Sequence, residues 1–155
     1  MDKVCSFFGH RKIEKSEALQ EKLAILVESL IKREFTVFFF GGFGEFDELC
    51  YRVVSLLRQK YPHIKRIYCV SGEKQLQERK RLRYFPLEEY EDFIYLPPSF
   101  DYWYTRIYYR NCAMIDTSDA VIFYAEEREN SGAYKAYKYA KCKKDKYIVN
   151  LWRMV

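Results

Sequence analysis

The hydrophobic positions of this chain alternate between two periods, which predicts alternating strands and helices. Short runs rich in β-branched and aromatic residues predict strands over residues 4–8, 36–40, 64–70, 93–96, 120–124 and 147–151. Between these runs, apolar residues recur three or four positions apart, as they do on one face of a helix. Such stripes follow Ser16, Gly44 and Ser131 and fill 105–117, and serine is a favoured N-cap residue. The stripe after Ser16 is expected to consist of Leu19, Leu23, Leu26 and Leu30. We therefore expect an α/β fold, a three-layer sandwich in which helices flank both faces of a mainly parallel central sheet.

The pattern extends over residues 1–155 without an internal repeat or a low-complexity linker, so we expect a single domain. Apolar runs such as Val37–Phe40 are far too short to cross a bilayer, and the first residues lack the apolar core of a signal peptide. We expect a cytoplasmic protein with no membrane partner. Residues 71–91 break the pattern because charges of both signs crowd this stretch, and we interpret it as a variable connection or a lid.

The charge and the cysteines narrow the range of functions. The net charge is +5, and residues 135–146 hold six lysines against one aspartate. A solvated helix end is the plain interpretation of this run, and affinity for nucleic acid is the alternative. The five cysteines are odd in number and form no CxxC pair, so we expect reduced, mostly buried thiols rather than disulfides or a metal site.

Short polar turns follow several of the predicted strands. They are Gly9-His10-Arg11, Gly41–Glu48, Ser71-Gly72 and Ser131-Gly132. The carboxyl ends of parallel strands meet at one edge of a sheet, and ligands of open parallel sheets bind outside that edge. The sequence therefore predicts that these turns surround a binding site.

The turn Gly41–Gly44 is the most informative of them. Glycines let the backbone adopt positive φ and let a ligand approach closely, and the start of the following helix offers unpaired N–H groups that favour a phosphate. The alternative is a tight turn that needs glycine for its geometry alone. The three carboxylates of residues 45–48 repel an anion, so a phosphate there needs the compensating charge of Arg11 or Arg110. Alternatively, one carboxylate faces a ribose hydroxyl or acts as a general base, or the group holds Mg²⁺ together with a phosphate ligand.

Polar side chains on the predicted helix 105–117 and after the first strand supply further candidates. Arg106 and Arg110 are four positions apart, hence on one face, and arginine suits bidentate phosphate contacts; a plain surface face is the alternative. Asn111 lies at the edge of the apolar stripe, where it bonds either a ligand or a neighbouring backbone group. His10 either contacts a phosphate, shuttles protons, or is structural. No cluster of histidine, cysteine and carboxylate has metal-ligand spacing, so no metal site is expected.

As a set, these pieces resemble a known group of proteins. The pieces are Cys5–Arg11, Phe40–Asp47, Arg110–Asp116, Ser118-Asp119, and the ending Ser131-Gly132-Ala133, Ala140-Lys141 and Asn150-Leu151. They resemble the YpsA-related branch of the SLOG superfamily, small bacterial proteins with a Rossmann-like fold whose distant relatives include the DprA/Smf proteins and the lysine-decarboxylase-like LOG proteins. The resemblance covers nearly the whole chain and is weakest over 72–104. It implies a Rossmann-like domain that binds nucleotides or nucleotide-derived molecules.

The glycine-rich turn is similar to a motif of the LOG enzymes, which cleave the N-glycosidic bond of nucleoside monophosphates. Their Pro-Gly-Gly-x-Gly-Thr-x-x-Glu corresponds to Gly41, Gly42, Gly44 and Glu48 here, with Phe40 at the proline and Glu45 at the threonine. Their Arg-Lys pair corresponds to Arg110-Asn111. The resemblance thus implies Glu48 and Arg110 as the catalytic residues if this chain is an enzyme.

Three functions fit this sequence. The favoured one is a binding or sensing module for a nucleotide or nucleotide-derived small molecule, contacted by Gly9, His10, Arg11, Gly41, Gly42, Phe43, Gly44, Glu45, Asn111, Ser131 and Gly132. The second is a hydrolase of N-glycosidic bonds in nucleotides, in which Glu48 stabilises the oxocarbenium-like ribose or activates water and Arg110 holds the 5′-phosphate. The third is binding of single-stranded DNA of the DprA type, which the lysine run permits and the carboxylates of 45–48 oppose. None of them requires a cofactor, and each is compatible with a homo-oligomer.

Overall fold

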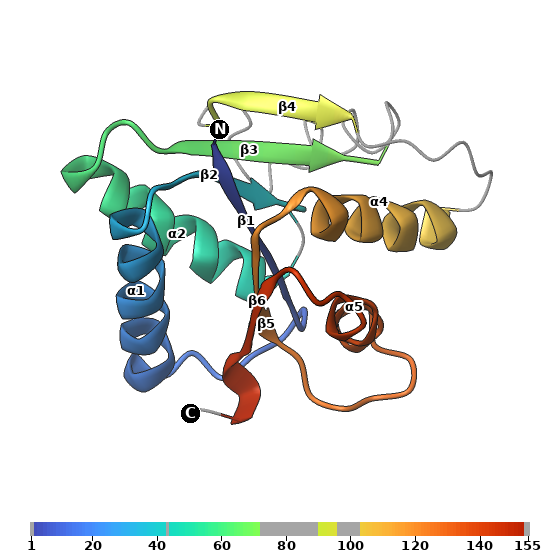
Figure 1. The fold of residues 1–155 in the computed structure, drawn as a ribbon. Helices are drawn as coiled ribbons and strands as arrows, with labels where there is room; N and C mark the ends of the chain where they lie inside the picture. Colours follow the sequence, from blue (N-terminus) through green and yellow to red (C-terminus); the bar gives the residue numbers. More distant parts are fainter. Residues whose placement is uncertain (1, 43, 72–89, 96–102, 154–155) are drawn as a thin grey trace, which may run out of the picture.

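The computed structural model describes residues 2–42, 44–71, 90–95 and 103–153, and Figure 1 shows their arrangement. The elements follow one another as β1 (Lys3–Gly9), α1 (Glu17–Lys32), β2 (Phe35–Phe40), α2 (Glu45–Lys60), β3 (Lys65–Val70), β4 (Asp92–Tyr95), α4 (Trp103–Thr117), β5 (Ala120–Tyr124), α5 (Gly132–Lys141), β6 (Tyr147–Asn150) and the 3₁₀ helix η2 (Leu151–Arg153). Each strand and helix that the hydrophobic pattern predicts is present, with small differences at the ends.

The six strands form one sheet in the order β4-β3-β2-β1-β5-β6, and every neighbouring pair is parallel. The chain therefore builds outward from β1 to β4 and then returns to the other side of β1 to add β5 and β6. The order reverses between β1 and β5, and open parallel sheets bind their ligands at this kind of switch point. The α/β, Rossmann-like fold predicted from the sequence is confirmed.

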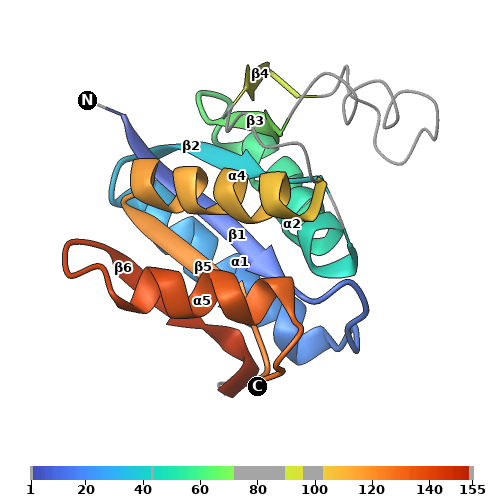
Figure 2. The same cartoon turned by 90° about the vertical axis from the view of Figure 1, so that its right-hand side faces the viewer.

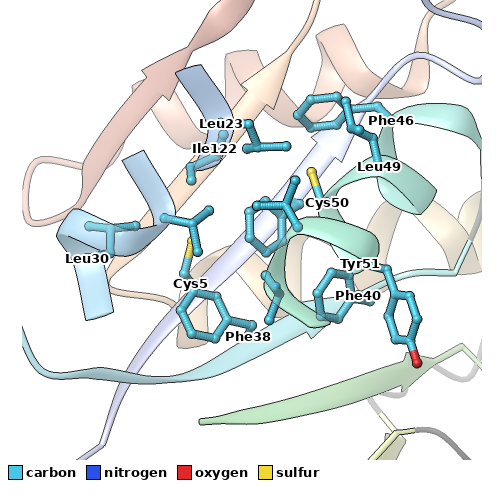
Figure 3. Packing of buried hydrophobic residues seen from close by; sticks show 14 of the residues in the cluster. Cys5, Leu23, Leu30, Phe38, Phe40, Phe46, Leu49, Cys50, Tyr51 and Ile122 are labelled. Carbon is cyan, nitrogen blue, oxygen red and sulfur yellow. The ribbon is translucent and has the colours of Figure 1, made fainter. Parts of the chain in front are cut away.

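Helices cover both faces of the sheet, α1 and α2 on one face and α4 and α5 on the other (Figures 1 and 2). Because successive side chains of a strand point to opposite faces, the apolar runs of the central strands fill two cores. Phe38 and Ile122 pack beneath α1 and α2 against side chains such as Leu23 and Cys50 (Figure 3). The core under α4 and α5 contains Val4, Phe39, Met114, Val121, Phe123 and Ala136. Burial on both faces explains why these strands are apolar throughout.

The start of α1 confirms the predicted cap and corrects one position of the apolar stripe. The Oγ of Ser16 accepts a hydrogen bond from the Leu19 N–H at 3.1 Å. Leu19 and Leu23 are fully buried as expected, but Val27 rather than Leu26 is the fully buried residue of the next turn. The reason is geometric: the buried residues of α1 centre on the direction of Leu23, and at about 100° per residue Val27 lies about 40° from that direction whereas Leu26 lies about 60° away on the other side.

Two other sequence predictions concern the thiols and the charged segment. Four of the five cysteines are buried, Cys142 is exposed, and all five are free thiols, which confirms the prediction of mostly buried, unpaired cysteines. The connection or lid predicted over 71–91 lies, except for its ends, outside the described residues. Within the ranges that the structure describes, no helix has the length and apolar character needed to cross a membrane.

Candidate functional site

A cleft of about 710 Å³ opens at the carboxyl edge of the sheet, beside the switch point between β1 and β5. Figure 2 shows α4 and α5 in front of the sheet, with the end of β1 close to the start of α5. The residues that line the cleft, in the described part of the chain, are Phe7, Phe8, Gly9, His10, Arg11, Lys12, Gly41, Asp47, Ile107, Arg110, Asn111, Arg128, Asn130, Ser131, Gly132 and Ala133. The cleft thus collects residues from the ends of β1, β2 and β5 and from α4.

Most of the site residues predicted from the sequence border this cleft. They are Gly9, His10, Arg11, Gly41, Arg110, Asn111, Ser131 and Gly132. Four predicted residues are not among the lining residues, namely Gly42, Gly44, Glu45 and Glu48. Phe43 lies outside the described residues. The turns after β1, β2 and β5 therefore do meet, whereas Asp47 is the only described residue of 42–48 that lines the cleft.

Charged side chains hold one peptide unit of the cleft wall, between Gly41 and Gly42, at both ends. Its carbonyl oxygen accepts a hydrogen bond from Nη1 of Arg110 at 3.2 Å, and its N–H donates to Oδ2 of Asp47 at 2.9 Å. Both charged residues are buried, Arg110 being 4% and Asp47 6% exposed. Hydrogen bonds to ionised groups are roughly twice as strong as neutral ones. The N–H of Gly42, a residue predicted to contact the ligand, is therefore already hydrogen-bonded to a side chain of the protein.

Arg110 also joins α4 to a second strand and to its own neighbour. Its Nη1 donates to the Cys69 carbonyl at 3.4 Å, at the end of β3, and its Nε and Nη2 donate to Oδ1 of Asn111 at 3.3 and 2.9 Å. The predicted phosphate ligand is thus a buried cross-link between α4 and the ends of β2 and β3. Burial raises the pKa of the adjacent Cys69 thiol to about 12, an effect that Arg110 reduces and Asp47 reinforces. This thiol is protonated at neutral pH and is no nucleophile.

Gly42 and Gly44 are glycines for reasons of local geometry. Gly42 has a φ of 70°, and a Cβ there would lie 2.1 Å from Cε2 of Tyr68. Gly44, the N-cap of α2, has a φ of 97°, and its Cβ would lie 2.9 Å from the Cα of Arg11. Residues other than glycine rarely adopt positive φ. The alternative interpretation of the turn, that it needs glycine for its backbone geometry, therefore accounts for these two positions.

The three carboxylates at the start of α2 are engaged by three different partners. Oε1 of Glu45 accepts a hydrogen bond from the Ile13 N–H at 2.9 Å and so fastens the segment after β1. Glu48 forms an exposed ion pair with Arg52 one helical turn later, and Asp47 holds the Gly41–Gly42 peptide. In the described ranges, no group of three or more histidine, cysteine or acidic side chains could hold a metal ion. Mg²⁺ held here together with a phosphate ligand stays a prediction.

His10 is buried at the end of β1, with 6% of its surface exposed, and both ring nitrogens have partners. Its Nε2 accepts a hydrogen bond from the Glu126 N–H at 2.7 Å, which places the ring proton on Nδ1, 3.4 Å from Oγ of Ser131. Burial and the charge of Arg128 lower the pKa of His10, and Glu126 opposes this in part. The ring is neutral at pH 7, and its contacts are those of a structural histidine.

The sequence missed several residues of the cleft. Lys12, Ile107, Arg128, Asn130 and Asp47 line it but were not predicted as ligand contacts. The sequence did hold a signal for Arg128 and Asn130, because both lie between the end of a predicted strand and the predicted N-cap Ser131. Ligands of parallel sheets bind outside the carboxyl ends of the strands, so every residue of this connection was a candidate. Ser131 is confirmed as the N-cap of α5, since its Oγ accepts from the Tyr134 N–H at 3.1 Å.

Some of the residues behind the family resemblance serve the fold rather than the cleft. Oδ2 of Asp119 accepts a hydrogen bond from the Val4 N–H at 2.9 Å, at the amino edge of the sheet. Ser118 bonds through Oγ to Oγ of Ser6 at 2.6 Å. Asn150 bonds both main-chain groups of Ala125, at 3.1 and 2.9 Å. These contacts fix where β1, β5 and β6 begin and end.

Comparison with known proteins gives likeness of fold. No protein-family model matches the chain, and none of the curated proteins matches its sequence. Among solved structures, the fold is similar to DNA processing protein A (DprA) from Streptococcus pneumoniae, with a TM-score of 0.60 and 17% identity over 90% of this chain and 47% of that one. It is also similar to DprA from Helicobacter pylori, described with a single-stranded DNA binding mode, with a TM-score of 0.61 and 15% identity over 95% of this chain and 64% of that one.

The chain therefore spans about half to two thirds of the length of these structures. The comparison agrees with the sequence resemblance at the level of the fold, because DprA proteins are among the relatives that the resemblance names. Membership of the YpsA-related branch stays a prediction.

Proposed function

We propose that this domain binds a nucleotide or a nucleotide-derived small molecule in the cleft, as a binding or sensing module. The observation that carries the proposal is the composition of the cleft at the switch point. Among the described residues, four basic side chains, Arg11, Lys12, Arg110 and Arg128, border it against one carboxylate, Asp47. Small anionic ligands of parallel α/β sheets bind at this place in the fold.

Among the described residues, the exposed charged side chains that line the cleft are positive. They are Arg11, Lys12 and Arg128, of which Arg128 forms an ion pair with Glu126, Nη2 to Oε2 at 2.5 Å. Asp47 is buried and already accepts the Gly42 N–H, so its charge is partly offset inside the protein. A phosphate group entering the cleft meets arginine side chains, whose planar guanidinium suits bidentate contact with phosphate oxygens.

The start of α5 adds to this positive environment. Gly132 and Ala133 belong to the first turn of α5 and line the cleft. The first N–H groups of a helix have no partner within the helix, and the helix dipole is positive at this end. A Cβ at Gly132 would meet no atom of the described residues within 4 Å, so these residues leave space beside this turn. We place the phosphate between this turn and Arg128.

The volume supports a ligand of nucleotide size. Clefts of roughly 300–1,000 Å³ hold small molecules and cofactors, and this one measures about 710 Å³. Its wall combines the polar groups above with the apolar side chains of Phe8, Ile107 and Ala133. A phosphorylated nucleoside has the matching combination of an anionic end and a flat, less polar end.

The N-glycosidase alternative gains no support from the described residues. Glu48, its proposed carboxylate, pairs with Arg52 and is not a lining residue, and Arg110 bonds main-chain oxygens. Asp47 lines the cleft but holds the Gly42 N–H. We therefore favour binding without turnover, and catalysis stays a prediction from the sequence resemblance.

The test is a thermal-shift screen against nucleoside mono-, di- and triphosphates, cyclic nucleotides and nicotinamide dinucleotides, followed by chromatography of each hit. A ligand that binds only the native state raises Tm by mass action. We expect a shift with the ligand recovered intact, and loss of that shift in Arg128→Ala. Arg52→Ala removes an arginine outside the cleft and serves as the matched control. Release of free base and ribose phosphate would favour the hydrolase, and the absence of any shift would remove the proposal.

Single-stranded DNA is the second candidate, and the likeness to DprA structures favours it. The lysines of α5 and the connection after it, including Lys135, Lys138 and Lys141, offer a basic path for a phosphate backbone. Fluorescence anisotropy with labelled oligothymidines of increasing length separates the two candidates. Binding to DNA strengthens with length and weakens steeply with salt, with a slope of about −0.7 per phosphate contact. A mononucleotide site shows neither behaviour.

A further inference from the structure

The connection between β5 and α5, residues 125–131, carries one side of the cleft. We call it the β5–α5 arm. Arg128, Asn130 and Ser131 of this arm line the cleft. Its first residue, Ala125, is fixed by Asn150 through two hydrogen bonds. What holds the remainder in place decides whether these three side chains face the cleft.

His10 is the residue of the opposite wall that holds the arm. Its Nε2 accepts the Glu126 N–H at 2.7 Å, and its Nδ1 lies 3.4 Å from Oγ of Ser131, the N-cap of α5. One ring thus contacts the arm near both ends. The ring is held in turn by edge contacts with Tyr124 and Trp152, at centroid distances of 6.4 and 6.2 Å. Its main-chain N–H donates to the Tyr124 carbonyl at 3.3 Å.

We infer that His10 is the positioning residue of the cleft, and that the neutral imidazole docks the β5–α5 arm so that Arg128, Asn130 and Ser131 face the ligand. The geometry requires the neutral form of the His10 imidazole, because this ring accepts a main-chain hydrogen bond from the arm. Only an unprotonated Nε2 can accept the Glu126 N–H, and a proton there would place two donors against each other. His10 therefore acts through the arm, and acidification releases the arm from β1.

The charges around the ring determine how readily it is protonated. The arm contributes the carboxylate of Glu126 and the guanidinium of Arg128, which form an ion pair with each other, and β5 contributes the ring of Tyr124. Arg11 and Lys12 follow His10 on its own segment. Burial and Arg128 oppose the imidazolium and outweigh Glu126, so the pKa of His10 lies below its ordinary value. The arm should thus stay docked at neutral pH and open only at acidic pH.

The functional consequence, weaker ligand binding at acidic pH, rests on the proposed function, but the structural claim does not. If protonation leaves the arm docked in one molecule in ten, the apparent Kd rises about tenfold, because only the competent fraction binds. The test of docking therefore uses the protein without any ligand, so that its result is independent of whether the ligand is found.

The experiment is a pH titration by NMR of the ¹⁵N-labelled protein from pH 8 to pH 5, following the amides of residues 125–131 and the imidazole nitrogens. The chain has two histidines, His10 and His63, so His63→Gln assigns the ring signals and serves as the control. We expect His10 to be the Nδ1–H tautomer, and the Glu126 amide to move with the protonation of His10 below pH 6.5. In His63→Gln the response of the arm should be unchanged.

Two variants separate positioning from packing. His10→Gln supplies a neutral amide oxygen that can accept the Glu126 N–H, so its arm amides should keep their neutral-pH positions and lose the pH response. His10→Phe retains a ring without an acceptor, so its arm amides should be displaced at every pH. The inference is overturned if wild-type His10 is the Nε2–H tautomer, if the arm amides do not follow its protonation, or if His10→Phe leaves them in place.

Discussion

The peptide between Gly41 and Gly42 gives the sharpest test of how the cleft wall is held. Asp47→Ala removes the acceptor of the Gly42 N–H, which is 2.9 Å away and buried. Truncating a charged partner of a buried hydrogen bond costs roughly 1.5–3 kcal/mol. The buried Arg110, which binds the other end of the same peptide, also loses a nearby opposite charge. We therefore expect Asp47→Ala to lower the free energy of unfolding by roughly 2–4 kcal/mol.

Urea unfolding at pH 7 measures this cost, and a thermal melt should show a fall in Tm on the order of 10 °C for a domain of this size. Asp47→Asn keeps an oxygen that can accept the Gly42 N–H, so it should retain about half of the lost stability. Glu48→Ala removes the next acidic residue, whose ion pair is exposed, and should cost no more than about 0.5 kcal/mol. The reasoning is refuted if Asp47→Ala unfolds like the wild type, or if Asp47→Asn is as unstable as Asp47→Ala.

Three further changes have defined outcomes. Gly42→Ala forces a side chain into positive φ and against the ring of Tyr68, so calorimetry should show a loss of roughly 2–4 kcal/mol; an unchanged Tm would contradict the turn geometry. Glu48→Gln should leave ligand affinity by titration calorimetry unchanged, because the side chain pairs with Arg52 outside the cleft, and a tenfold loss would restore it as a site residue. Folding lowers the pKa of His10, so its contribution to stability is complete above about pH 6.5 and falls as the pH drops below that value. In urea titrations, the wild type should therefore lose stability relative to His10→Gln between pH 7 and pH 5. Parallel stability curves for the two proteins would count against a neutral ring.

The fold followed from the sequence because its signals are local. Caps at Ser16 and Ser131, and apolar runs such as 120–124 between helical stripes, each depend on a few neighbouring residues. Alternation of strands and helices leaves few arrangements other than a parallel sheet with helices on both faces. The place of the cleft followed from the same reasoning, since the turns after β1, β2 and β5 meet at the carboxyl edge.

The roles of individual side chains did not follow, because they depend on contacts distant in the sequence. A phosphate contact of Arg110 stays a prediction, whereas its bond to the carbonyl of Gly41, after β2, could not be predicted from spacing. Glu45, Asp47 and Glu48 stand within four positions of each other and serve three different partners. A helix turns by about 100° per residue, so neighbours in the sequence face different surroundings. The spacing predicts that these carboxylates lie in the first helical turn, but it does not predict which way each side chain points.

The most direct test of the proposed ligand site compares two nearly isosteric changes at Gly132. A Cβ there meets no atom within 4 Å in the part of the chain that the structure describes, and an acidic residue in the first turn of a helix is favourable, so both Gly132→Asn and Gly132→Asp should fold with wild-type stability. Titration calorimetry with the nucleotide that gives the largest thermal shift then isolates the effect of charge. We expect Gly132→Asp to bind at least about tenfold more weakly than Gly132→Asn, a difference of 1.4 kcal/mol. Equal affinity in the two variants would show that no anionic group of the ligand lies at the start of α5 and would contradict the account.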